Sequence, residues 1–114
     1  MSPTNRLFRE LVDTVARVYD MNTDELTTEN QYAPAGVHEA RQVVCLVAVE
    51  VLGVSQRQVA KLMQRDPRAI NNGLKVLRAK LEKSPLLRRV VDQVTKRTKR
   101  AVQEFDVFAR EAAE

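Results

Sequence analysis

The sequence contains no tryptophan, and its 114 residues include only five other aromatic side chains, a single cysteine and three glycines. Its core must therefore be aliphatic. The longest apolar run, Val43 to Leu52, is interrupted by Glu50 and is half as long as a membrane span. Cys45 is the only cysteine, which excludes an intramolecular disulfide, and its position in this run predicts a buried, inert thiol in a reducing compartment. Met1 to Thr4 show no secretory signal pattern, so we expect a cytoplasmic protein without membrane contact.

Residues that carry common catalytic chemistry are also scarce. His38 is the only histidine, and no cluster of cysteine and histidine has the spacing of a zinc site. The three glycines are isolated, so there is no glycine-rich nucleotide loop. The neighbouring acids Asp24 and Glu25 fit the first turn of a short helix. We therefore expect no enzymatic activity, no metal, no cofactor and no small-molecule substrate.

Positive charge is abundant but confined to one segment. The whole chain has a net charge of +4, whereas residues 57–100 contain fourteen Lys or Arg against three acids, a net charge of +11. The segments on either side, 1–56 and 101–114, are net acidic at −4 and −3. Such a block is typical of a protein that binds nucleic-acid phosphates. A basic helical surface that merely contacts solvent has the same composition, so charge alone leaves both interpretations open.

Apolar residues recur at steps of three and four along most of the chain, which predicts an all-α fold, a compact bundle of about five helices. We expect long helices over 5–19, 37–52, 56–63, 67–83 and from 85 onward, a short helical turn over 24–26 and a loop over 27–36. The helix over 37–52 is apolar on nearly every side and should be central. We divide the chain into a DNA-binding domain over 1–95 and an extension over 96–114, with a basic junction and an amphipathic helix.

Two consecutive helices in the basic segment have the lengths and spacing of a helix-turn-helix, over Ser55 to Leu81. Ser55 caps the first helix, and Asp66 followed by Pro67 begins the second. Ala60 supplies the small residue needed where the helices approach, and Ile70 the branched residue that packs between them. The turn residue, commonly glycine, is Gln64 here.

The outer side of the second helix predicts what the pair does. With Ile70, Leu74, Leu77 and Leu81 directed inward, Arg68, Asn72, Lys75 and Ala79 face outward and Asn71 and Arg78 lie on the flanks. Arginine and asparagine suit guanine and adenine edges in the major groove. We therefore expect base contacts from Arg68, Asn71 and Asn72. Phosphate contacts are expected from Arg57, Lys61, Arg65, Lys75 and Arg78.

At these residues the chain resembles a known family. From Val15 to Val94 it is similar to the C-terminal DNA-binding domain of the bacterial replication initiator, DnaA. The likeness rests on five short segments: Val15 to Tyr19, Asp24 to Leu26, Ala40 to Gln42, Ser55 to Val59, and Arg65-Asp66 with Ile70. A helix-turn-helix of the Trp-repressor type has a similar arrangement and remains an alternative.

The resemblance implies a helix-turn-helix that binds double-stranded DNA, in a regulator of transcription or replication associated with the nucleoid. It adds Asp66 and Ala69 to the expected base contacts and Arg41 to the expected phosphate contacts. The family's signature histidine and two threonines, which contact bases, correspond to Pro67, Arg68 and Ala69 here. The family's basic loop corresponds to residues 31–40, which contain no Lys or Arg. The resemblance thus predicts the fold and the kind of partner, but not the initiator's usual DNA site.

Two further alternatives stay open. The missing basic loop and the apolar tail (Val102, Phe105, Phe108) also fit a protein-interaction module that has lost base readout. The tail itself has two interpretations: a homodimer through the C-terminal helix, which would pair two recognition helices, or a helix that lies back on the first one.

Overall fold

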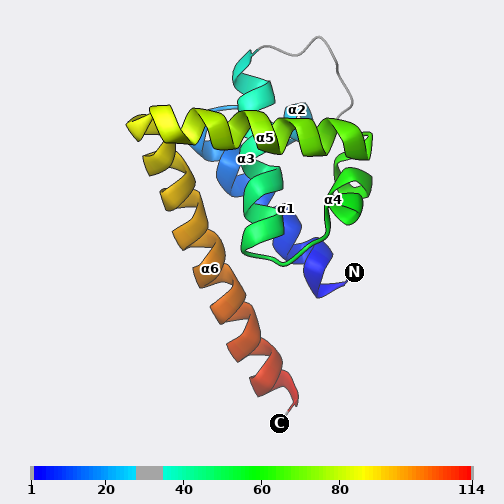
Figure 1. The fold of residues 1–114 in the computed structure, drawn as a ribbon. Coiled ribbons are helices and arrows are strands. Elements are labelled where there is room, and N and C mark those ends of the chain that lie inside the picture. Colours follow the sequence, from blue (N-terminus) through cyan, green and yellow to red (C-terminus); the bar gives the residue numbers. More distant parts are fainter. Residues whose placement is uncertain (1, 28–34, 114) are drawn as a thin grey trace.

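The computed structural model describes residues 2–27 and 35–113, and in these ranges the chain is helical without strands (Figure 1). The helices are α1 (Pro3–Val18), α2 (Thr23–Thr27), α3 (Ala35–Glu50), α4 (Gln56–Met63), α5 (Pro67–Lys83) and α6 (Pro85–Ala113). The all-α prediction is confirmed, and the bounds of α4 and α5 are those expected from the sequence. Most of the loop expected over 27–36 lies outside the described residues. At its edges, Thr27 belongs to α2, and residues 35 and 36 belong to α3.

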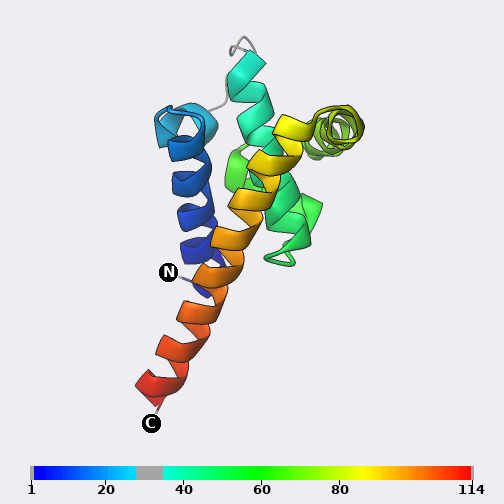
Figure 2. The same ribbon diagram turned by 90° about the vertical axis from the view of Figure 1, so that its left-hand side faces the viewer.

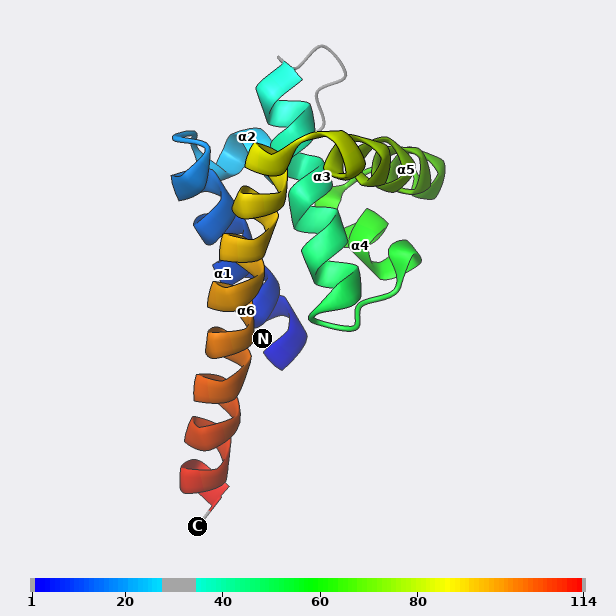
Figure 3. The same ribbon diagram turned by 60° about the vertical axis from the view of Figure 1, so that its left-hand side comes forward.

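Helix α3 is the centre of the bundle. It packs against each of the other five helices, and its residues from Val43 to Ala48 are all buried. A helix that is apolar on every side can bury its surface only by being surrounded, so the expectation of a central helix is confirmed. Figure 3 shows α3 passing between α1 and α6 on one side and α4 and α5 on the other.

Local capping signals set the beginnings of the later helices. The Ser55 Oγ accepts a hydrogen bond of 3.1 Å from the Gln58 N–H at the start of α4. The Ser84 Oγ accepts one of 3.1 Å from the Leu87 N–H at the start of α6. Each bond satisfies an amide that the first helical turn leaves without a partner. Gly53, which follows α3, has the left-handed φ of +68° that favours glycine.

Helix α6 continues without a break through the point at which we divided the chain. No glycine or proline occurs after Pro85, and the 29-residue helix passes through the basic segment 96–100. Its first half packs on the bundle, with Leu87 and Val94 buried. Its second half lies beside α1 and extends beyond the rest of the bundle (Figures 1 and 2).

A polar contact joins Tyr19, the residue that follows α1, to α3 at the edge of the core. The Tyr19 hydroxyl donates a hydrogen bond of 2.8 Å to the Glu39 Oε2. Burial of the phenol, its bond to Glu39 and the charge of Glu39 all raise the pKa of Tyr19. The phenol therefore stays protonated and continues to donate throughout the neutral range.

Candidate nucleic-acid interface

Helices α4 and α5 form a pair joined by the three residues Gln64, Arg65 and Asp66, and we refer to this pair as the α4–α5 unit. Gln64 ends α4 in the left-handed conformation, with φ 54° and ψ 47°. A side chain costs roughly 1 kcal/mol in that conformation, which explains why glycine is common at such turns. The Gln64 N–H bonds to carbonyl oxygens of the last turn of α4, which closes the helix.

The two helices are in contact, and each buries one side in the core. Ala60 in α4 is 3% exposed, and Ile70 in α5 is also 3% exposed. Leu74 and Leu77 continue the buried side of α5, and both have no exposed surface. The inward side of α5 is therefore the one predicted from its helical period, and the opposite side is left for other contacts.

Helix α5 lies at the margin of the molecule. It crosses in front of α3 in Figure 1, and in Figure 2, where it is seen along its axis, it forms the outermost part of one side. Seven exposed residues make up what we call the outer face of α5: Arg68, Asn71, Asn72, Lys75, Val76, Arg78 and Ala79. No acidic residue occurs between Pro67 and Leu81, so this face is basic and amide-rich over about three turns.

Neighbouring acids do little to neutralise this face. The Arg78 Nη2 lies 3.8 Å from the Glu50 Oε1, and both side chains are more than half exposed. A solvent-exposed pair at this distance contributes about 0–1 kcal/mol, so Arg78 can exchange Glu50 for another anion at little cost. The Asp66 Oδ1 accepts a hydrogen bond of 2.7 Å from the Arg68 N–H, so this carboxylate caps its own helix.

Of the five expected base-contacting residues, three lie on the outer face of α5 and two do not. Arg68, Asn71 and Asn72 are exposed on the outer face of α5. Asp66 is exposed but holds the helix start. Ala69 is partly buried and lines a cavity against α3, so its methyl group points away from the centre of the outer face. The structure brings three of the five onto one surface.

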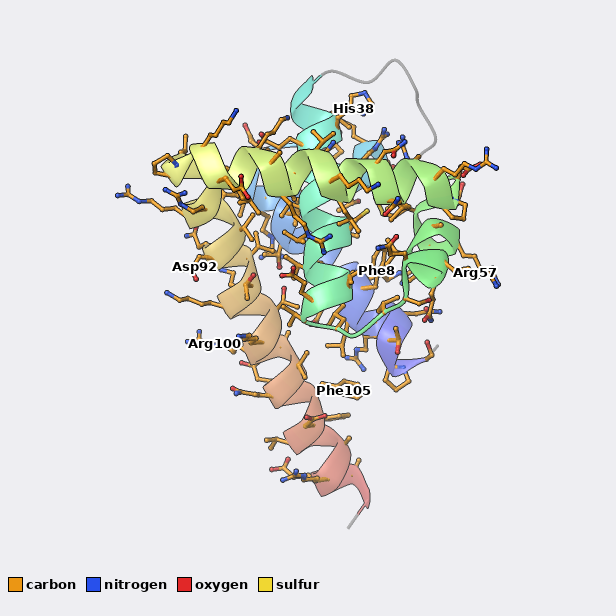
Figure 4. All side chains as sticks on the ribbon, in the orientation of Figure 1. Phe8, His38, Arg57, Asp92, Arg100 and Phe105 are labelled. Atoms are coloured by element: carbon orange, nitrogen blue, oxygen red, sulfur yellow. The ribbon has the colours of Figure 1, made fainter. Side chains whose placement is uncertain are left out.

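The expected phosphate-contacting residues are exposed with two exceptions. Arg57 and Lys61 in α4 and Lys75 and Arg78 in α5 are exposed, and Figure 4 shows Arg57 directed outward from α4. Arg65 is partly buried. We correct the assignment of Arg41, which is only 4% exposed and donates a 2.7 Å hydrogen bond from Nη2 to the Glu25 carbonyl oxygen. Its guanidinium joins α3 to α2 and is not presented at the surface.

A cavity of about 50 Å³ lies between α3 and α5. Its lining residues are His38, Arg41, Gln42, Cys45, Arg65, Ala69, Ile70 and Gly73. Burial of the guanidinium and the nearby positive charge of Arg65 lower the pKa of Arg41. Burial also raises the pKa of the Cys45 thiol, to about 12, so this cysteine is protonated and unreactive at neutral pH. The predicted inert thiol agrees with this environment.

The sequence reasoning missed Val76. It is 47% exposed on the outer face of α5, one turn after Asn72. Val76 has no place in the predicted outer side, although the period that places Ile70 inward places Val76 outward. An exposed branched methyl group beside amide and guanidinium groups suits contact with a thymine methyl.

Basic residues continue past the end of α5. The Arg88 Nη1 donates to the carbonyl oxygens of Leu81 and Glu82, at 3.0 and 3.2 Å, and so caps the last turn of α5. The junction between α5 and α6 also carries the exposed side chains of Lys80, Lys83 and Arg89. The positive surface therefore extends from the α4–α5 unit onto the start of α6.

Within residues 2–27 and 35–113 no group of three or more metal-ligating side chains is close enough to hold an ion. None of the helices in these ranges has the length and hydropathy needed to cross a membrane. No protein-family model matches the sequence, and no curated protein matches it either.

Proposed function

We propose that this protein binds double-stranded DNA through the α4–α5 unit, which acts as a helix-turn-helix with α5 in the major groove. One observation carries the proposal: the outer face of α5 is exposed, contains arginine, lysine and asparagine, and has no acidic residue. A helix stabilised only by its own surface pairs usually includes Glu four residues before Lys or Arg. Instead, this helix presents the side chains that read purine edges.

The arrangement of the basic residues supports this proposal. Arg68, Asn71 and Asn72 lie in the first half of α5, which is the part of a recognition helix that contacts bases. Arg57 and Lys61 lie on α4, where the first helix of such a pair contacts the phosphate backbone. The proposed base contacts thus come from α5 alone, whereas α4 adds phosphate contacts to those of Lys75 and Arg78 on α5.

We further propose that the scaffold is similar to the DNA-binding domain of the bacterial replication initiator, with the Trp-repressor type as the alternative. The order of helices and the position of the α4–α5 unit support this relation. The expected role is regulation of transcription or replication at the nucleoid, in the cytoplasm, by binding without catalysis. Because Arg41 is buried and residues 31–40 lack Lys and Arg, we propose that readout relies on α5.

Fluorescence anisotropy with a labelled random-sequence duplex, measured across salt concentrations, tests the proposal. Binding should be detectable at about 50 mM salt and should weaken by at least about tenfold by roughly 200 mM, because phosphate contacts release counterions. No binding at low salt, or binding that is insensitive to salt, would contradict it. Selection of bound duplexes from a random library would then identify the site. Arg68→Ala should relax the preference at one position and cost about 1–3 kcal/mol.

A protein-binding role is the second candidate, and exposed apolar side chains on α6 favour it. Leu86 is 71% exposed and Phe108 is 61% exposed. A stable complex with another protein, together with no change in duplex anisotropy, would support this role instead.

A further inference from the structure

The second half of α6 has one edge covered by α1 and another that α1 leaves open. A groove of about 160 Å³ between the two helices is lined on α6 by Ala101, Glu104, Phe105 and Phe108. Higher along the helix, Arg97 and Thr98 also line a groove against α1. Thus α1 occupies one side of α6, and Figure 4 shows Phe105 directed toward the N-terminal end of α1.

The helical period places a different set of residues on the edge next to the side that α1 covers. Relative to Phe105, the positions three before and four after are Val102 and Ala109, which lie on the same turn-to-turn row. Lys99 and Asp106 border this row on the side away from α1. Val102 is partly buried, whereas Ala109, Lys99 and Asp106 are exposed. This open edge therefore has an apolar centre with one basic and one acidic border position.

Charge is separated along the same helix. Residues 96–100 contribute four positive charges, whereas residues 104–114 contain four acids and one arginine. Neither Lys99 nor Asp106 belongs to the two ion pairs found among the described residues. A surface with a basic end and an acidic end is complementary to itself when a second copy lies in the opposite direction.

We propose that the open edge of α6 is a homodimer interface in which two α6 helices pair antiparallel. A two-fold axis near Val102 and Gln103 places segment 96–100 of one copy beside segment 105–109 of the other. Lys99 then faces the partner's Asp106, and this ion pair occurs twice because the interface is isologous. A parallel pair would instead place Lys99 against the partner's Lys99, with like charges in contact. The occupant of this edge is therefore a second copy of the chain, and the inference stands independently of DNA binding.

Sedimentation equilibrium of the full chain without DNA tests this interface by exchange of charge. Lys99→Glu and Asp106→Lys should each raise the dimer dissociation constant by about tenfold, because each places two like-charge pairs in the interface. The double variant Lys99→Glu/Asp106→Lys should restore the wild-type constant. An equimolar mixture of the two single variants should also restore it, because both ion pairs re-form in the heterodimer.

Arg100→Glu is the matched control. It reverses the same charge on the same helix, but Arg100 is exposed and lies about 100° further round the helix from Lys99, on the side opposite Val102 and Ala109. Its dissociation constant should match that of the wild type. A wild-type chain that remains monomeric at millimolar concentration would overturn the proposal. Single variants that dimerise like the wild type, or a double variant that fails to recover, would overturn the antiparallel pairing. Because these measurements contain no DNA, their failure is distinct from a failure of duplex binding.

Discussion

The backbone of Gly73 in α5 approaches the Gln42 side chain in α3 so closely that a methyl group on Gly73 would lie 3.3 Å from the Gln42 Cγ. Glycine in a helix interior costs about 1 kcal/mol relative to alanine. Gly73 lies where α5 crosses the central helix α3. The absence of a side chain at Gly73 allows the two helices to approach closely at this point. The outer face of α5 is held at its position partly by this crossing.

Substitution of Gly73 should therefore depend on size. Gln42 must move by a few tenths of an ångström to accommodate alanine, and it borders the cavity between α3 and α5. We expect Gly73→Ala to raise the free energy of unfolding by up to about 1 kcal/mol. Gly73→Val should lower it by about 1–3 kcal/mol, because the larger side chain overpacks the crossing. Urea denaturation measures both. A destabilised Gly73→Ala variant would show that Gln42 cannot move aside.

Burial of Cys45 should make stability fall at alkaline pH. Its pKa is about 12 in the folded chain, whereas an exposed thiol ionises near pH 8.5. Between these values the folded state retains a proton that the unfolded state has released. The free energy of unfolding should therefore decrease as pH rises above about 8.5, by as much as about 1.4 kcal/mol per pH unit.

Urea denaturation at about pH 8 and about pH 10 checks this effect against Cys45→Ala. That variant removes the thiol and leaves Tyr19, whose pKa is also raised by burial. The wild type should lose more stability between the two conditions than the variant loses. Equal losses would mean that the thiol ionises at its ordinary pKa within the folded chain.

Parts of the candidate site follow from local sequence, and other parts do not. The bounds of α4 and α5 could be predicted because Ser55, Asp66 and Pro67 act through bonds within one turn of themselves. The burial of Arg41 could not be predicted in this way. It depends on a hydrogen bond to the Glu25 carbonyl oxygen in α2, and Glu25 is sixteen residues earlier in the chain. A single arginine in an apolar helix is predicted to be at the surface unless its tertiary partner is known.

The same distinction applies to Ala69 and to α6. The resemblance predicts a base contact at Ala69, but Ala69 lines the cavity between α3 and α5 together with Gly73, and this position depends on how the two helices pack. The charge of the basic segment 96–100 predicts a junction, whereas α6 passes through it. Charge does not end a helix, and neither glycine nor proline is present there to do so.

Asp66 has two assigned roles that substitution can separate. As a cap, it requires only a side-chain oxygen that accepts from the Arg68 N–H. Asp66→Ala should therefore lower the free energy of unfolding by about 1 kcal/mol, whereas Asp66→Asn should change it by less than about 0.5 kcal/mol. Asp66→Asn should also bind duplex DNA more tightly, because a negative charge near the phosphates is removed. Weaker binding by a fully stable Asp66→Asn variant would instead show that the carboxylate contacts DNA.

Arg41 and Arg57 provide a paired test of which arginines contact phosphate. Arg41 is buried and bonded to the Glu25 carbonyl oxygen, whereas Arg57 is exposed at the start of α4. Arg41→Ala should lower the free energy of unfolding by about 1–3 kcal/mol, because the hydrogen bond to the Glu25 carbonyl and the packing of a buried side chain are both lost. The dependence of duplex affinity on salt should stay as in the wild type.

Arg57→Gln should give the opposite pattern. Its side chain is exposed, so the free energy of unfolding should change by less than about 0.5 kcal/mol. The slope of log affinity against log salt should fall by about 1, because one phosphate contact is lost. Urea denaturation and salt-dependent anisotropy on the two variants measure both quantities. A reduced salt slope in Arg41→Ala, at temperatures where that variant is fully folded, would return Arg41 to the interface. It would mean that DNA binding opens the contact between α2 and α3.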